Sequence, residues 1–399
     1  MTLLIDPPNA AGHGRLWSHL ASDASYDELH VFAASLGIPR RGFDRDHYDI
    51  PAERYDAVVA AGATPVTSRE LIARLKAAGL RQRKSETLRP RPPGQALVRA
   101  PRLRAGDRVA VVSPSGPVAP ERLAAGLEVL ASWGLDPVVA EHARGTDSRF
   151  GYLSADDATR AADLTRAWLD PEVRAVVCAR GGYGAQRVVD LLDWEVLAAA
   201  GPKVLLGFSD VTALHQAFAA RLGLSTVHGP VVSSLGRADE ATREHLRTML
   251  LDPAPGTSLT PTPATTLVPG RAEGVLLGGN LALLAAGVGT PAGLPARGAV
   301  VVLEDVAEEA YRLDRLLTQL LRSGWFDGVR GIALGHFTDC ASPPAVRDLA
   351  LERLGPLGVP MVAGLPVGHE RSNLAFPLGV PAVLDADAGT LVLRQAALR

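Results

Sequence analysis

One stretch near the middle of the chain, residues 203–215, constrains the fold more than any other. Residues 204–206 are an uninterrupted apolar run that ends at a glycine, which is typical of a buried strand. Ser209 and Asp210 follow, and the apolar residues after them recur at helical spacing. A strand, a sharp turn and a helix in this order favour an α/β fold. A serine on such a turn has its hydroxyl held clear of the backbone, as a nucleophile requires.

The same stretch has a purely structural interpretation. Ser and Asp are favoured N-cap residues, so Ser209 and Asp210 could simply begin a helix. The pattern also lacks the second glycine of the G-x-S-x-G motif, because Val211 stands there. The choice between nucleophile and cap therefore depends on residues further along the chain.

Composition excludes several classes of protein. The chain has 399 residues, of which 47% are hydrophobic, so it can bury large cores in two or three domains. The net charge of −2 gives no general attraction to nucleic acid or anionic membranes. Two cysteines far apart argue against a disulfide framework, and we find neither a signal peptide nor a membrane-spanning run. We expect a cytoplasmic protein that binds neither membrane nor nucleic acid.

The sequence predicts three folded parts joined by two irregular segments. We expect a doubly wound, mostly parallel α/β sheet domain that carries Ser209, a smaller, β-rich C-terminal α/β domain, and a small separate α/β module before them. The expected bounds are 1–82 for the module, 83–100 for a basic, proline-rich linker, 101–250 for the first large domain, 251–270 for a proline-rich crossover and 271–399 for the C-terminal domain.

The first module is rich in histidine and aspartate. One hypothesis is a metal or phosphate site built from Asp6, His19 and His47 with Arg40 or Arg41. The alternative is that these are solvated polar residues and helix caps, since no pair has H-x-x-x-H spacing. We therefore predict no metal ligands and no cofactor.

Two more polar stretches follow predicted strands of the first large domain. Ser113 lies after the strand 108–112, and the glycine-rich turn 180–184 follows the strand 174–179. Ligands bind beyond the carboxyl ends of strands in such sheets. We therefore name Arg180, Tyr183 and Ser113 as candidate substrate-binding residues.

The C-terminal domain offers a carboxylate and an imidazole that would complete a catalytic triad. Glu304 lies at the end of an apolar strand, where a carboxylate is costly unless it is hydrogen-bonded. His369 lies in a loop rich in glycine and proline. Ser209, Glu304 and His369 could form a triad, although on pattern alone His336 competes with His369.

Residues 101–399 resemble the LD-carboxypeptidase family of serine peptidases, which includes the microcin C immunity proteins. The matching stretches are residues 179–184, 207–212, 228–230, 277–281, 303–306, 311–315, 368–369, 373 and 377–379. The resemblance implies Ser209 as nucleophile, Glu304 as orienting carboxylate and His369 as base, with an oxyanion hole formed by the N–H groups of Gly182 and Asp210. It also implies a homodimer without metal or other cofactor, and release of D-alanine from cytoplasmic murein tetrapeptides during cell-wall recycling.

Two alternatives remain at this point. Within the family, the substrate could be a peptidyl or aminoacyl nucleotide, as in resistance to microcin-like antibiotics. Residues 219–310 contain no Phe, Trp or Tyr to stack on a base, which favours the murein peptide. Outside the family's activity, the protein could be a non-catalytic module that binds peptide or nucleic acid. Residues 1–82 resemble a small bacterial domain of unknown function through stretches 14–20, 37–43 and 45–49.

Overall fold

The chain forms two compact units, Met1–Ser85 and Glu86–Arg399. The structure is a computed structural model that describes residues 3–12, 14–44, 46–78, 80, 88–147, 149–260, 262 and 264–399. Among these residues no helix is both long and apolar enough to cross a membrane.

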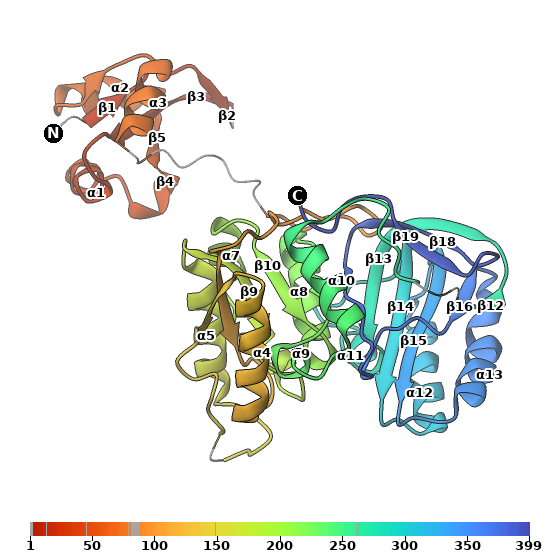
Figure 1. Cartoon of the computed structure of the whole chain (residues 1–399). Coiled ribbons are helices and arrows are strands. Elements are labelled where there is room, and N and C mark those ends of the chain that lie inside the picture. The colour runs from red at the N-terminus through yellow and green to blue at the C-terminus, as the bar shows by residue number, and fades with distance from the viewer. Residues whose placement is uncertain are drawn as a thin grey trace. The chain divides into compact units, whose positions relative to one another are not determined.

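The first unit is a small mixed sheet with helices (Figure 1). Its strand order is β4-β5-β3-β1-β6, and β2 pairs with β3. Leu20, Tyr48 and Ile50 lie in a core with the first two helices. Successive residues of a strand face opposite sides of the sheet, so the residues next to Leu20, Tyr48 and Ile50 lie on the other face. The elements are β1 Leu3–Ile5, β2 Ala10–Gly12, β3 Arg15–Ser22, α1 Tyr26–Ser35, β4 Phe43–Asp44, β5 His47–Pro51, α2 Tyr55–Ala60, β6 Thr64–Pro65 and α3 Ser68–Ala77.

The second unit contains two sheets, and we call the first of them the nucleophile sheet. Its order is β17-β11-β10-β9-β7-β8, and the pairings from β8 to β11 are all parallel. Its elements are β7 Arg108–Val112, α4 Pro120–Ser132, β8 Asp136–Val139, α5 Asp157–Leu169, β9 Val173–Cys178, α6 Ala185–Val189, α7 Trp194–Ala199, β10 Val204–Gly207, α8 Thr212–Leu222, β11 Val227–His228, α9 Val232–Leu235, α10 Glu240–Leu251 and β17 Phe376–Pro377.

Helices cover both faces of the nucleophile sheet (Figure 1). Val112 and Leu205 face a core shared with α5 and α8, whereas Val111 and Leu206 face a core shared with α4 and α10. Burial on both faces explains why these strands are continuous apolar runs rather than alternating ones. The predicted doubly wound, mostly parallel fold is confirmed.

The second sheet, which we call the C-terminal sheet, has the order β12-β16-β15-β14-β13-β18-β19. Its helices α11, α12 and α13 pack on one face, and apolar residues of the segment 365–378 pack on the other. Its elements are β12 Thr265–Val268, β13 Arg271–Asn280, α11 Leu281–Ala286, β14 Ala299–Val306, α12 Ala310–Arg322, β15 Gly331–Thr338, α13 Pro343–Leu354, β16 Met361–Ala363, β18 Pro381–Asp385 and β19 Thr390–Leu393.

The segment between β16 and β17 connects the two sheets. It leaves the C-terminal sheet at Ala363 and ends in β17, which pairs antiparallel with β11 of the nucleophile sheet. The sheets also meet where the N–H of Asn280 donates to the Thr212 hydroxyl at 3.1 Å. The second contact fixes the end of β13 beside the first turn of α8, and Asn280 is paired there with Glu304 of β14.

The segment expected as a linker differs from expectation in its second half. Residues 83–87 lie outside the described residues, but Leu88 and Val98 are buried in the second unit. The N–H of Leu97 donates to Gly379 at 2.9 Å, and Val98 exchanges hydrogen bonds with Gly223 and Ser225. The basic, proline-rich composition predicted an extended chain, yet these three apolar residues attach it to the second unit.

Candidate active site

Ser209 lies on a strained turn directly after β10. Its φ is +64°, in the left-handed region that costs a non-glycine residue about 1–2 kcal/mol. A short 3-10 turn, Ser209–Val211, then leads into α8. Val211, which replaces the second glycine of the G-x-S-x-G motif, packs so closely on Gly207 that a Cβ there would lie 2.8 Å from its Cγ1. The turn therefore holds the Ser209 hydroxyl away from the sheet.

Glu304 is fully buried near the end of β14. The register of β14 with β15 shifts between Leu303 and Asp305, so β15 has an extra residue opposite Glu304. Such bulges re-aim side chains and are frequent beside active sites. Here the shift lies at Glu304, whose buried carboxylate points to His369 and not into the apolar core.

His369 joins the other two residues by hydrogen bonds. Its Nδ1 lies 2.8 Å from Glu304 Oε2, and its Nε2 lies 3.0 Å from Ser209 Oγ. The loop that carries it is held where the N–H of Gly368 donates to Asn373 Oδ1 at 3.0 Å. His336, the competing histidine, makes neither contact, and its Nδ1 is buried without a hydrogen-bond partner among the described residues. The structure thus brings together the three residues named from the sequence.

The carboxylates around His369 control its protonation. Burial acts to lower the pKa of His369, but the hydrogen bond to Glu304 and the charges of Glu304, Asp305 and Glu370 outweigh burial and raise the pKa above the ordinary 6.5. Since Nδ1 faces a carboxylate, the proton of a neutral ring belongs on Nδ1. Nε2 is then free to accept the Ser209 proton.

Asp210 connects the turn of Ser209 to the glycine-rich loop. Its buried carboxylate accepts from the Ser115 hydroxyl at 2.6 Å and from the N–H of Ala185 at 2.8 Å. Burial raises the pKa of Asp210, although both of these bonds favour its ionised form. In the described part of the chain, the N–H groups of Gly182 and Asp210 have no hydrogen-bond acceptor. Both groups are therefore available to a ligand.

A cavity of about 420 Å³ lies beside Ser209 and His369. Gly182 and Phe208 line it, and so do four arginines that form no ion pair with any described carboxylate. These arginines are Arg122, Arg180, Arg237 and Arg371. Sequence reasoning found Arg180 only. The other three come from separate segments, and a lone arginine carries no signal that it faces a cleft.

The other two candidate substrate-binding residues lie elsewhere. Ser113 is buried, and its hydroxyl donates to the carbonyl of Ala143 at 2.7 Å, so it braces a loop and does not line the cavity. A serine after a strand can face either a ligand or a neighbouring loop. Here the hydroxyl of Ser113 faces the loop, because it donates its hydrogen bond to Ala143. Tyr183 is exposed and contacts Tyr152, with ring centroids 5.9 Å apart.

The doubly wound fold and the hydrogen-bonded hydroxyl, imidazole and carboxylate beside a cleft are those of a serine hydrolase. The chain belongs to the LD-carboxypeptidase family of serine peptidases, because its residues 109–229 match the family's N-terminal domain and residues 273–384 its C-terminal domain. Residues 3–78 match a family described as a protein of unknown function (DUF4031).

Individual relatives agree with this assignment. A putative carboxypeptidase of Streptomyces coelicolor is 58% identical over 304 residues, which cover 76% of this chain and 98% of the relative. A murein tetrapeptide carboxypeptidase of Pseudomonas aeruginosa is 38% identical over 291 residues, 70% of this chain and 94% of the relative. Among solved structures, the microcin C7 self-immunity protein in its wild-type apo state has a TM-score of 0.68 at 25% identity, covering 76% and 100% of the two chains.

Proposed function

We propose that the protein is an LD-carboxypeptidase that removes the terminal D-alanine from murein tetrapeptides in the cytoplasm during cell-wall recycling. The observation that carries the proposal is the hydrogen-bonded series from Ser209 Oγ through His369 to Glu304, beside a cavity lined by four arginines that form no ion pair with a described carboxylate. A murein tetrapeptide has several carboxylates, and arginine binds carboxylates well because its guanidinium is always charged and planar.

The reaction follows from the position of each group. Ser209 Oγ attacks the carbonyl carbon of the scissile bond while His369 Nε2 takes its proton. The oxygen of the tetrahedral intermediate accepts hydrogen bonds from the N–H groups of Gly182 and Asp210. His369 returns the proton to the leaving amine of D-alanine, which departs and leaves an acyl-enzyme on Ser209. Water deprotonated by His369 then hydrolyses this ester and regenerates the serine.

The test is mass spectrometry of L-Ala-γ-D-Glu-meso-diaminopimelate-D-Ala incubated with the wild-type and Ser209→Ala proteins. We expect the wild type to release one D-alanine and Ser209→Ala to lose roughly 10⁴- to 10⁶-fold in rate. Ser132→Ala is the control, because this exposed serine only bonds within α4. Turnover by Ser209→Ala at the wild-type rate would contradict the assignment of the nucleophile.

One observation favours a second substrate class, a peptidyl or aminoacyl nucleotide. Tyr152 and Tyr183 are both exposed, Phe150 lies against Tyr152, and Tyr183 directly follows Gly182. Exposed aromatic rings can stack on a nucleobase. Against this, the two exposed tyrosines do not line the cavity. Phe208 is the single Phe, Tyr or Trp among the described residues that line it, which favours the murein peptide. An aminoacyl sulfamoyl adenosine assayed beside the tetrapeptide distinguishes the two, and its faster cleavage would reverse the order of the proposals.

The homodimer implied by the family resemblance remains a prediction. Size-exclusion chromatography with light scattering measures it directly, and a mass of one chain would contradict it.

A further inference from the structure

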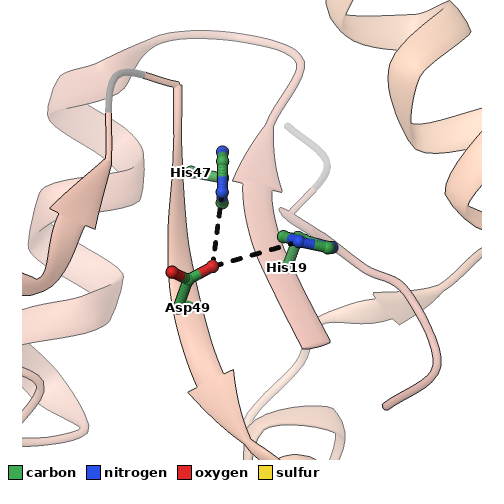
Figure 2. Close-up of side chains that lie close together, drawn as sticks. All are labelled: His19, His47 and Asp49. Atoms are coloured by element: carbon green, nitrogen blue, oxygen red, sulfur yellow. Dashed lines mark ion pairs between the residues drawn. The ribbon is translucent and has the colours of Figure 1, made fainter. Parts of the chain in front are cut away.

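The first unit gathers histidines and carboxylates at a place that plays no part in the proposed peptidase reaction. His19 lies on β3, and His47 and Asp49 lie on β5 (Figure 2). Asp49 is the residue directly opposite His19 in the antiparallel pair, and His47 precedes Asp49 by two residues. Side chains two apart on a strand, and side chains opposite each other across a ladder, share one face of the sheet. The three side chains therefore converge outside the hydrophobic core.

The spacing of the three side chains suits one bound ion. His47 Nε2 lies 3.3 Å and His19 Nε2 lies 4.0 Å from the same oxygen, Asp49 Oδ1, and the three atoms all lie within 4.8 Å of one another. Metal bonds of about 2.0–2.1 Å in a tetrahedral site put ligand atoms roughly 3.3 Å apart. The His47–Asp49 pair already has this separation. His19, whose side chain is 32% exposed, needs only a small rotation to reach it.

Each imidazole is held from behind by a buried carboxylate. His19 Nδ1 lies 2.9 Å from Asp6 Oδ2, and His47 Nδ1 lies 2.7 Å from Asp46 Oδ1, while both aspartates are only 1% exposed. Asp6 is itself fixed by the Ser68 hydroxyl at 2.6 Å and by the N–H of His19 at 2.6 Å. A carboxylate on Nδ1 keeps the proton there and leaves the Nε2 lone pair free, as in carboxylate–histidine–zinc sites.

We propose that His19, His47 and Asp49 bind a divalent first-row transition metal ion such as Zn²⁺, with Asp6 and Asp46 orienting the two imidazoles. Two imidazoles and one carboxylate favour such an ion over Mg²⁺ or Ca²⁺, which prefer oxygen ligands alone. Three protein ligands leave at least one coordination position for water or a small ligand. Asp49, which is 47% exposed, places that position at the surface of the unit.

The residues of this proposal differ from those of the sequence hypothesis, and the proposal departs from our prediction of no metal ligands. Asp6, His19 and His47 do come together, but Asp6 stands behind His19 and the third ligand is Asp49. Arg40 acts electrostatically on His30 and Tyr48, and Tyr48 is on the opposite face of β5 from His47, so Arg40 is not part of the cluster. The side chain of Arg41 lies outside the described residues. A histidine and an aspartate two apart on a strand were the signal that a search for helical spacing missed.

A proton is the competing occupant of the space between His47 and Asp49. Burial acts to lower the pKa of His47, but hydrogen bonds to Asp46 and Asp49 raise it to about 9. A protonated His47 would satisfy both carboxylates without a metal. The two interpretations differ in one measurable respect, which is stoichiometric binding of a metal at neutral pH.

The experiment is titration of the full-length, chelator-treated protein with Co²⁺, followed by displacement with Zn²⁺. Co²⁺ absorbs visible light more strongly when its coordination number is low. The absorption spectrum therefore measures the coordination number of bound Co²⁺, independently of peptidase activity. We expect one Co²⁺ per chain. We also expect binding to weaken by roughly 100-fold or more in Asp49→Asn and His47→Gln, and by about 10- to 100-fold in Asp6→Asn.

The matched control is His142→Gln in the second unit. His142 also pairs with a buried aspartate, Asp163, at 3.1 Å, and Glu141 lies 3.8 Å from its Nε2, but in the described residues His142 belongs to no group of three ligand atoms close enough for one ion. The His142→Gln variant should bind Co²⁺ with the same stoichiometry and affinity as the wild type. If His47→Gln or Asp6→Asn unfolds the first unit, shown by circular dichroism, Asp49→Asn decides, because its exposed side chain supports no core. Absence of stoichiometric binding in the wild type, undiminished binding by Asp49→Asn, or an equal loss in His142→Gln would overturn the proposal.

Discussion

At the scale of single residues, the candidate active site depends on a carboxylate held where water cannot reach it. Glu304 is fully buried, and only Oε2 has a partner among the described residues, the Nδ1 of His369. Burial of an ionised carboxylate is costly, and the cost falls when the neighbouring imidazole takes a proton. In the proposed reaction, Glu304 would therefore stabilise the protonated His369 that forms when Ser209 attacks.

This placement predicts the pH dependence of a Glu304→Gln variant. The base must be neutral to act, so kcat/KM of the wild type should fall as pH decreases through the raised pKa of His369. Without the charge of Glu304, only Asp305 and Glu370 oppose the effect of burial, so the pKa of His369 should fall and the acidic limb should move to lower pH. The maximal rate should also fall by roughly 10²- to 10⁴-fold, because the tautomer of His369 is no longer fixed.

The measurement is a pH profile of tetrapeptide hydrolysis for the wild type, Glu304→Gln and Glu244→Gln. Glu244 is an exposed glutamate that pairs with Arg247 on α10, so its replacement should leave the profile unchanged. An acidic limb in the same position for all three proteins would show that Glu304 does not set the pKa of His369.

The sequence predicted some residues of the candidate active site and missed others. The strand-to-helix pattern was sufficient to propose Ser209, because the turn is local. Spacing alone could not choose between His336, which lies in β15, and His369, which lies in the loop after β16, because the choice depends on which of the two reaches Ser209 in the fold. Arg122, Arg237 and Arg371 were missed for the same reason, since only the fold brings them to one cavity.

At the scale of elements, the wall of the cleft depends on close packing between two helices. Gly126 of α4 approaches α9 so closely that a Cβ would lie 1.9 Å from the Val232 carbonyl oxygen and 2.7 Å from its Cγ1. Several residues at or just before the N-terminal end of α9, among them Val231, Ser233 and Ser234, line the cavity. The separation of α4 and α9 therefore helps set the position of this wall.

Gly126→Ala should thus destabilise the second unit and weaken substrate binding. An extra methyl group in a packed interface forces a backbone shift, which costs about 1–3 kcal/mol of unfolding free energy. Urea denaturation measures this cost, and KM for the tetrapeptide should rise with it. Gly355→Ala is the control, because no heavy atom lies within 4 Å of the added Cβ and its φ of −52° suits alanine. Equal stability of the two variants would contradict the packing argument.

Elements differ in how far the sequence predicts them. The alternating apolar strands and helices of residues 108–222 predicted the parallel sheet, because each strand is long and apolar enough to be recognised. The strand β17 has only two residues, so no pattern could have joined it to the nucleophile sheet. Period-two spacing of His47 and Asp49 is equally short, and it acquires meaning only when β3 is paired with β5.

At the scale of the whole molecule, two units with separate cores share one chain. Among the described residues, the cores of the first unit include none beyond Leu80, and those of the second begin at Leu88. The Streptomyces coelicolor relative aligns over 98% of its own length but over only 76% of this chain. Nearly the whole relative therefore corresponds to about three quarters of this chain, which leaves no room in it for a counterpart of the first unit. We therefore expect the second unit to fold and to act alone.

The prediction is tested with two shortened proteins that differ in where they begin. A protein of residues 86–399 should hydrolyse the tetrapeptide with kcat/KM within roughly twofold of the full chain, because its core and cleft are complete. A protein of residues 101–399 should be less stable. It loses Leu88, Leu97 and Val98, whose side chains are 3%, 9% and 5% exposed, and each contributes about 1.5–3 kcal/mol through burial.

Comparison of the two shortened proteins separates dispensable chain from structural chain. If residues 86–399 fail to fold or lose activity while the full chain retains both, then the first unit takes part in the peptidase and the independence of the two cores is wrong. If residues 101–399 are as stable as residues 86–399, then the packing of segment 88–100 contributes nothing. If both expectations are met, the first unit is not required for peptidase activity. A variant that loses the proposed metal site should then hydrolyse the tetrapeptide like the wild type.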